Sequence, residues 1–235
     1  MPLEIGLLTF PNVQQLDLTA PYEVFVGIPD ARVRLVATGP GPVTSSTGLV
    51  LTPTHTVDDC PQLDVLCIPG GIGVNALMQD AALLAFVRAQ AARARYVTSV
   101  CTGALVLGAA GLLRGRRATT HWASLDLLAA FGAIPVAERV VRDGNLLTGG
   151  GVTAGIDFAL TLAAEIAGRP EAETIQLGLE YAPAPPFAAG TPATASPAVL
   201  AATRARLAAG RAERERIVGA ISGAPAIVAW PKPKP

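Results

Sequence analysis

Short, almost continuous apolar stretches recur along the chain and alternate with segments in which apolar residues have helical spacing. Four of these stretches are predicted to be buried β-strands, at residues 3–9, 32–37, 64–69 and 94–100. Apolar positions at helical spacing predict a long helix over residues 74–95 and a strongly apolar one over residues 153–167. Buried strands that alternate with helices are typical of a parallel sheet covered on both faces. The pattern therefore predicts an α/β fold, a doubly wound sandwich with a mostly parallel central sheet.

Weaker patterns predict the elements between and after these. We expect a short helix over residues 21–26, an antiparallel ribbon over 43–57, a short strand over 117–120, a helix over 124–131 and a hairpin over 139–148 that turns at Asp143 and Gly144. The residues that follow are read as an extended arm rich in Pro, Ala and Thr over 182–197, a helix over 198–220 and a frayed end over 231–235. This organisation divides the chain into one domain over residues 1–187 and a C-terminal arm and helix over residues 188–235.

Composition and charge narrow the kind of partner that such a domain binds. The 235 residues are enough for one sizeable core, and 51% of them are hydrophobic. Only 15% are charged, and 18 lysines and arginines are balanced by 18 acidic residues. A neutral chain of this kind gives no electrostatic basis for binding nucleic acid or an anionic membrane. We therefore expect a small molecule as its partner.

The amino-terminal sequence and the cysteines bear on compartment and on metals. The chain enters an apolar strand directly, without a basic region or a small-residue cleavage site, and no uncharged run is long enough to span a bilayer. We therefore expect a cytoplasmic protein. The three cysteines, an odd number at unpatterned positions, match neither a disulfide framework nor paired zinc ligands. Because His55 and His121 are the only histidines, no metal site is expected.

Cys101 stands where the buried strand at residues 94–100 breaks directly into an apolar helix. The unpaired N–H groups and the macrodipole at a helix N-terminus favour a thiolate over a thiol. The arrangement is that of a strand-to-helix nucleophile turn, and Gly103 lets neighbouring backbone approach closely. Cys101 is therefore a candidate nucleophile. The alternative is that it is only a small buried hydrophobic residue.

Other candidate residues follow neighbouring strands, whose carboxyl ends meet at one edge of a parallel sheet. Gly71 ends one strand and could place an N–H opposite that of Thr102, forming two donors for developing negative charge, although a Gly-Gly pair is more often only a turn. Gly150, Gly151 and Val152 follow another strand and are expected to line the pocket or donate backbone N–H groups. Glycine-lined backbone is thus expected to surround the thiol.

Three polar side chains are candidates for handling protons beside Cys101. Asp17 follows the first strand, and a protonated carboxyl there could donate to a thiolate; its alternative role is to cap the helix near Pro21. Thr102 supplies an N–H and a hydroxyl beside the sulfur, or is an ordinary residue at a helix start. His121 is expected to contact the residues that surround Cys101, or only to pack in the core, since nothing local requires it to contact Cys101 itself.

At these residues the chain resembles a known family. Pro69-Gly70-Gly71, the Cys101 turn and residues 118–122 are similar to the DJ-1/PfpI superfamily. Four further segments resemble the bacterial isocyanide hydratases within it: residues 14–19, 99–103, 149–151 and 179–187. The resemblance implies a flavodoxin-like homodimer. We also expect residues 188–235 to pack on the domain or on the dimer partner. It also implies Cys101 as nucleophile, Asp17 as acid and base, and Thr102 as an active-site threonine.

The activity that this resemblance implies is the addition of water to an organic isocyanide, which gives an N-substituted formamide. Cys101 would form a thioimidate with the substrate, and no metal or organic cofactor would be needed. Two departures from other superfamily members matter. Thr102 stands where protease-like members have histidine, which argues against peptidase activity, and Asp17 stands where many members have glutamate.

Two other functions remain open from the sequence. Transcription regulators of the arabinose-responsive type carry a similar domain with the Cys-Thr-Gly and Thr-Thr-His-Trp patterns, so a ligand-sensing regulatory domain is one alternative. The arginines beyond Phe187 alternate with glutamates and are read as a solvated helix face, not as a DNA-binding region. The other alternative is a glyoxalase or stress-response protein that uses Cys101 on reactive aldehydes.

Overall fold

Seven strands form the central sheet of the computed structural model, which describes residues 2–223. Their order across the sheet is β10 (Val140–Asp143), β11 (Leu146–Gly149), β7 (Tyr96–Val100), β6 (Val65–Ile68), β1 (Leu3–Thr9), β2 (Ala31–Ala37) and β5 (His55–Thr56). Every neighbouring pair is parallel except β10 with β11. The predicted mostly parallel sheet is confirmed.

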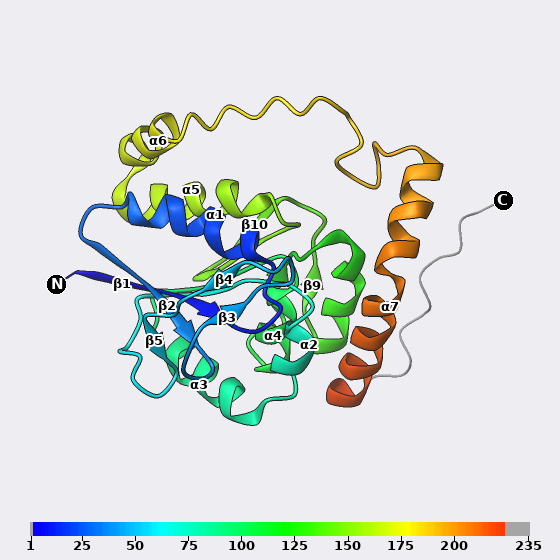
Figure 1. Cartoon of the computed structure of the whole chain (residues 1–235), viewed down its shortest axis with the longest axis horizontal. Helices are drawn as coiled ribbons and strands as arrows, with labels where there is room; N and C mark the ends of the chain where they lie inside the picture. The colour runs from blue at the N-terminus through cyan, green and yellow to red at the C-terminus, as the bar shows by residue number, and fades with distance from the viewer. Residues whose placement is uncertain (1, 224–235) are drawn as a thin grey trace.

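Helices cover both faces of this sheet, as Figure 1 shows. On one face lie α1 (Gln15–Val26), α5 (Ala154–Ala167) and α6 (Arg169–Gly178), and on the other lie α3 (Ala81–Ala91) and α4 (Gly103–Ala109). All four residues of β6 are buried, because a strand between two helical layers exposes neither side to water. The doubly wound α/β sandwich is therefore confirmed.

The long helix predicted over residues 74–95 is wrong, because the chain breaks there into two helices. A short helix α2 (Val74–Leu77) is followed by α3, and Asp80 stands between them. The Asp80 carboxylate accepts hydrogen bonds of 3.0 Å from the N–H groups of Ala82 and Leu83. Asp80 thus caps a new helix start, a local signal that the apolar spacing hides.

The first helix also differs from the prediction, because α1 begins at Gln15 and not near Pro21. Pro21 lies inside the helix, where its missing N–H removes one bond without ending the helix. Asp17 is therefore in the first turn of α1.

Smaller elements match the predictions in part. β3 (Val43–Thr44) and β4 (Val50–Leu51) form the predicted antiparallel ribbon, but β5 leaves it and joins the edge of the main sheet parallel to β2. β8 (Arg117–Ala118) pairs with β9 (Ile134–Pro135), and the predicted helix over residues 124–131 is the 3-10 helix η1 (Trp122–Phe131). The hairpin of β10 and β11 is confirmed, with Gly144 at φ +59° in its turn.

After α6, which the sequence patterns did not predict, the chain crosses the surface to the last helix, α7 (Pro197–Ser222). Every residue of the stretch 182–194 is exposed, as expected for an arm. In Figure 1, α7 (orange) stands at the end of the molecule, where it packs against η1, α2 and α4. The frayed end predicted over residues 231–235 lies outside the described residues.

The C-terminal arginines do not all lie on a solvated face, so that interpretation was wrong. Arg211 is 4% exposed and Arg214 is 9% exposed, and both are buried with Ile217 and Val218 on one side of α7. Their spacing of three and four residues places them on the same helix face.

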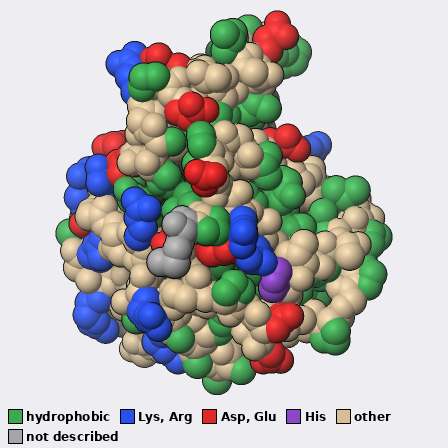
Figure 2. Space-filling model, turned by 90° about the vertical axis from the view of Figure 1, so that its left-hand side faces the viewer, with side chains coloured by type: hydrophobic (Ala, Val, Ile, Leu, Met, Phe, Trp, Pro, Cys, Tyr) green, Lys and Arg blue, Asp and Glu red, His purple; other side chains and the backbone are tan. Residues whose placement is uncertain are grey.

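No helix among residues 2–223 is long and apolar enough to cross a membrane. Figure 2 shows that arginine and acidic side chains both occur on the face nearest the N-terminus. That face therefore carries both signs of charge.

Candidate active site

Cys101 occupies a sharp turn between β7 and α4 and has a φ of +55°, a strained conformation for a residue with a side chain. Its N–H donates to Gly149 O at 3.1 Å and to Gly150 O at 2.8 Å. The Thr120 hydroxyl donates to Cys101 O at 2.6 Å. The backbone after β11 and the Thr120 side chain thus hold the strained turn in place.

Close packing behind the turn explains Gly103. A Cβ placed there would lie 2.0 Å from Ile68 O. Since β6 and α4 come together at this point, only a residue without a side chain fits.

We expect Gly103→Ala to lower the free energy of unfolding by about 2 kcal/mol or more, because the added methyl must displace the backbone of β6. Urea unfolding followed by circular dichroism measures this. Gly178→Ala in α6 is the matched control, since a Cβ there meets nothing within 4 Å. Equal stability of the two variants would show that the close packing is unimportant.

Asp17 is fully buried beside this turn. Its Oδ2 accepts a 3.0 Å hydrogen bond from Gly70 N, whereas Oδ1 has no hydrogen-bond partner among residues 2–223. Burial raises the pKa of Asp17 to about 7, opposed by the interaction with the Cys101 side chain and by the Gly70 N–H. The alternative role as a helix cap is wrong, because the side chain bonds to the loop after β6 and not to its own helix.

The Cys101 thiol is 6% exposed, and burial raises its pKa well above the usual range. The negative charge of Asp17 raises this pKa further, whereas the Thr102 N–H and the charge of Arg214 lower it. The expected helix N-terminal effect is present at Thr102 but is weaker than desolvation. Because burial and mutual repulsion oppose full ionisation, the carboxyl and the thiol keep at least one proton between them at neutral pH.

Thr102 connects this turn to the loop after β6. Its Oγ1 accepts from Gly71 N at 3.0 Å and donates to Gly71 O at 3.3 Å. The Gly71 N–H is therefore engaged and is not the free second donor that the sequence suggested. Gly71 has a φ of +125°, and a Cβ there would lie 2.4 Å from Gln14 N, so the glycine is required for the turn itself.

The predicted backbone donors after β11 divide into two kinds. Gly150 N donates to Arg139 O at 2.9 Å and is not available to a ligand. Gly151 and Val152, just before the N-cap of α5, donate to no acceptor in the described part of the chain. These two N–H groups remain candidates for binding a polar atom of a substrate.

His121 caps η1 and forms no hydrogen bond to Cys101 within residues 2–223. Its Nδ1 accepts from Ala123 N at 3.2 Å, and a Cβ at Gly151 would lie 3.1 Å from its ring. Burial, assisted by the charge of Arg214, lowers the pKa of His121 to about 4, so the ring is neutral at pH 7. Whether His121 supports the site or only packs stays a prediction. Residues 2–223 contain no group of three His, Cys, Asp or Glu side chains that could hold a metal ion.

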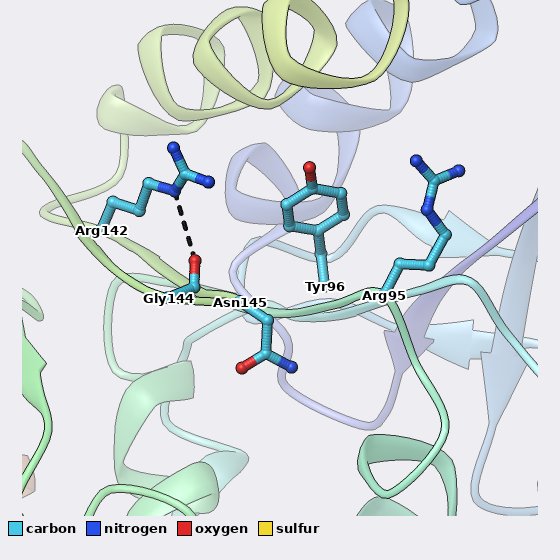
Figure 3. A pocket seen from close by; sticks show the side chains of 5 residues that line it. All are labelled: Arg95, Tyr96, Arg142, Gly144 and Asn145. Atoms are coloured by element: carbon cyan, nitrogen blue, oxygen red, sulfur yellow. Dashed lines mark hydrogen bonds between the residues drawn. The ribbon is translucent and has the colours of Figure 1, made fainter.

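Two surface cavities lie elsewhere. One of about 340 Å³ is lined by Arg95, Tyr96, Arg142, Gly144 and Asn145 (Figure 3). These residues belong to the start of β7 and to the β10–β11 hairpin turn, the sheet edge opposite Cys101. The other, of about 440 Å³, is lined by residues that include Asn12, Ile72, Asn75 and Glu213, on the outer side of the loop that holds Gly71. Cys101 does not line either cavity.

Sequence reasoning missed three contributors to the site. Gly70 donates to Asp17, Thr120 holds the Cys101 carbonyl, and Arg214 acts on the thiol from the C-terminal helix. A signal for Arg214 exists, because it shares a helix face with apolar residues.

Comparison with known proteins identifies a matching family and several similar proteins. The sequence profile of the DJ-1/PfpI family matches residues 4–165. The isonitrile hydratase of Pseudomonas putida is 65% identical over 208 residues, which cover 88% of this chain and 91% of that protein. The crystal structure of a ThiJ/PfpI family protein from Pseudomonas syringae superposes with a TM-score of 0.91 at 45% identity, covering 93% of this chain and 91% of that one. An HTH-type transcriptional regulator of Pseudomonas aeruginosa is 34% identical over 129 residues, 54% of this chain but only 35% of the regulator.

Proposed function

This chain belongs to the DJ-1/PfpI family, and we propose that its reaction is the hydration of an organic isocyanide to an N-substituted formamide. The observation that carries the proposal is the 65% identity, over 88% of the chain, to a protein named for hydrating isonitriles, the other word for isocyanides. The pairing of a buried thiol with a buried carboxyl of raised pKa supports it, because this reaction needs both a nucleophile and an acid.

In the first step, the Cys101 sulfur attacks the terminal isocyanide carbon and forms a carbon–sulfur bond. The same carbon accepts the proton that the Cys101–Asp17 pair holds, and the product is a thioimidate on Cys101 with Asp17 ionised. Oδ1 of Asp17, which has no hydrogen-bond partner among residues 2–223, is the atom we assign to this transfer. The Gly70 N–H holds the other oxygen and so orients the carboxyl.

In the second step, water adds to the thioimidate carbon. The Asp17 carboxylate takes a proton from the water and passes it to the substrate nitrogen. The tetrahedral intermediate then collapses, breaking the carbon–sulfur bond, and the proton of its hydroxyl returns to the Cys101–Asp17 pair. The formamide leaves, and every proton is accounted for without a cofactor.

A substrate panel tests this proposal directly. We expect the purified protein to convert alkyl or aryl isocyanides to formamides, measured by chromatography with mass detection, and to turn over methylglyoxal or peptides far more slowly. Faster conversion of methylglyoxal than of any isocyanide would favour the glyoxalase alternative. The regulator alternative has less support, because the chain matches only 35% of the length of the regulator it resembles.

We further propose that the protein acts as a homodimer. Leu177 is 81% exposed and Phe187 is 79% exposed, both in the stretch that leads from α6 into the arm. Contact with a second copy of the chain would remove these apolar side chains from water, which favours association. Light scattering at micromolar concentration is expected to give twice the 24.0 kDa mass of the chain, and the double change of Leu177 and Phe187 to serine is expected to reduce it. A wild-type mass equal to one chain would contradict the proposal.

We place the protein in the cytoplasm. All three cysteines are free thiols, and a reducing compartment keeps them so. For Cys101 this condition is essential, because the proposed reaction uses the reduced sulfur.

A further inference from the structure

Two buried arginines on α7 differ in how their charge is neutralised. Arg211 makes two 2.6 Å bonds to the Asp126 carboxylate and one of 2.7 Å to Glu215. Arg214 forms no ion pair among residues 2–223; its hydrogen-bond partners are neutral, Asn75 Oδ1 at 3.2 Å and Ser124 Oγ at 3.1 Å. A buried cation without a carboxylate partner is costly, so a nearby group that becomes negative would stabilise it.

The partners of Arg214 place the guanidinium next to the candidate active site. Ser124 lies in the first turn of η1, three residues after the His121 cap, and its N–H donates to His121 O at 2.8 Å. Asn75 lies in α2, four residues after Gly71, which is bonded to Thr102. α7 also packs against α4, the helix that starts beside Cys101. Arg214 is therefore held between η1 and α2, the helices that follow His121 and the Gly71 loop.

We propose that Arg214 is a positioning residue that holds a fixed positive charge for the Cys101 thiolate. The proposal deepens the proposed hydratase function, since Cys101 is the nucleophile of that reaction. A cation already in place, within a rigid and buried setting, stabilises the ionised sulfur without reorganisation when the substrate arrives. In exchange, the thiolate provides the negative charge that Arg214 lacks among its hydrogen-bond partners.

The electrostatics of the site agree with this role. The charge of Arg214 lowers the pKa of the Cys101 thiol, and Cys101 in turn raises the pKa of Arg214. Asp17, from α1, acts on the thiol in the opposite sense. His121 is neutral at pH 7, and the charged neighbours of Arg214 on its own helix, Arg211 and Glu213, have opposite signs.

The test is the pH dependence of Cys101 alkylation by iodoacetamide, which reacts with the thiolate and needs no isocyanide. We expect Arg214→Met to move this profile upward by about one pH unit, and so to slow alkylation roughly tenfold at neutral pH. Arg214→Lys retains the charge and is expected to restore most of the rate. Arg211→Met is the matched control, expected to lower the thermal stability and leave the profile in place.

Circular dichroism establishes that each variant is folded, and Arg214→Gln replaces Arg214→Met if the latter does not fold. A wild-type profile in the folded neutral variant would overturn the proposal, as would an equal shift in Arg211→Met, because either result would reduce Arg214 to helix packing. Failure of the wild type to make formamide would refute the proposed function and leave the alkylation result intact.

Discussion

Cys101→Ala is expected to abolish formamide production from isocyanides while leaving the protein folded. The change removes the sulfur that would bond to the isocyanide carbon, and no other described thiol lies in the same turn. Since only one heavy atom is lost from a buried position, the cost in the free energy of unfolding should be about 1 kcal/mol. Product formation by mass-detected chromatography and urea unfolding on the same samples measure the two effects.

Cys60→Ser is the control for this change, because Cys60 is a free and partly buried thiol outside the site. It should retain wild-type turnover. In wild-type enzyme quenched with acid during turnover, the mass of the substrate should be found on the peptide that contains Cys101. Wild-type turnover in Cys101→Ala would exclude the covalent mechanism.

Asp17→Asn is expected to slow hydration by roughly a hundredfold or more, the usual scale for losing a general acid and base. An asparagine can keep the hydrogen bond from Gly70 N, but it cannot deliver a proton to the substrate carbon. Cys101 should remain open to alkylation in this variant, and more readily so at neutral pH, because the negative charge that raises the pKa of the thiol is gone. Asp64→Asn is the control, since Asp64 also accepts a backbone N–H, from Glu4 at 2.9 Å, away from the site.

The same substitution should change how stability depends on pH. The pKa of Asp17 rises from 3.8 to about 7 in the folded protein, so between these values the folded state holds a proton that the unfolded state has released. The contribution of Asp17 to the free energy of unfolding is therefore complete below about pH 4 and is lost as the pH rises through about 7. The change amounts to about 4 kcal/mol. The lowered pKa of His121 acts in the opposite sense in both proteins, so the difference between them is the test. From pH 5 to pH 8 the free energy of unfolding measured in urea should fall less, or rise more, in Asp17→Asn than in the wild type. Equal changes in the two proteins would show that Asp17 does not carry this proton.

The parts of the fold that the sequence predicted correctly are those whose signal is local. Residues 65–68 form a continuous apolar run because β6 lies between two helical layers, and the last four residues of β7 are buried in the same way. The Cys101 turn was located for a similar reason, since a buried strand stops there and Gly103 follows. The rule that the carboxyl ends of parallel strands lie at one edge of the sheet is then enough to bring residues from distant segments together.

The errors arose where a polar side chain or a distant partner decides the outcome. Asp80 starts a new helix in a stretch where the helical spacing of apolar residues continues without a break. β5 pairs with β2 in the main sheet and not with the predicted ribbon. Gly71 was expected to donate to a ligand, but its N–H meets the Thr102 hydroxyl across 31 positions. Arg214 stands more than a hundred positions after Cys101 in the sequence, and no local pattern gives the docking of its helix on the domain.

The exposed stretch 182–194 is the covalent connection through which α7 follows the rest of the fold. While this tether is intact, docking of α7 is an intramolecular event with an effective concentration in the millimolar range, as for other short flexible linkers. A single proteolytic cut in the tether would make the same docking bimolecular. The cut protein would then keep Cys101 and Asp17 in place. The fraction of molecules in which α7, and with it Arg214, stays bound would fall as the protein is diluted.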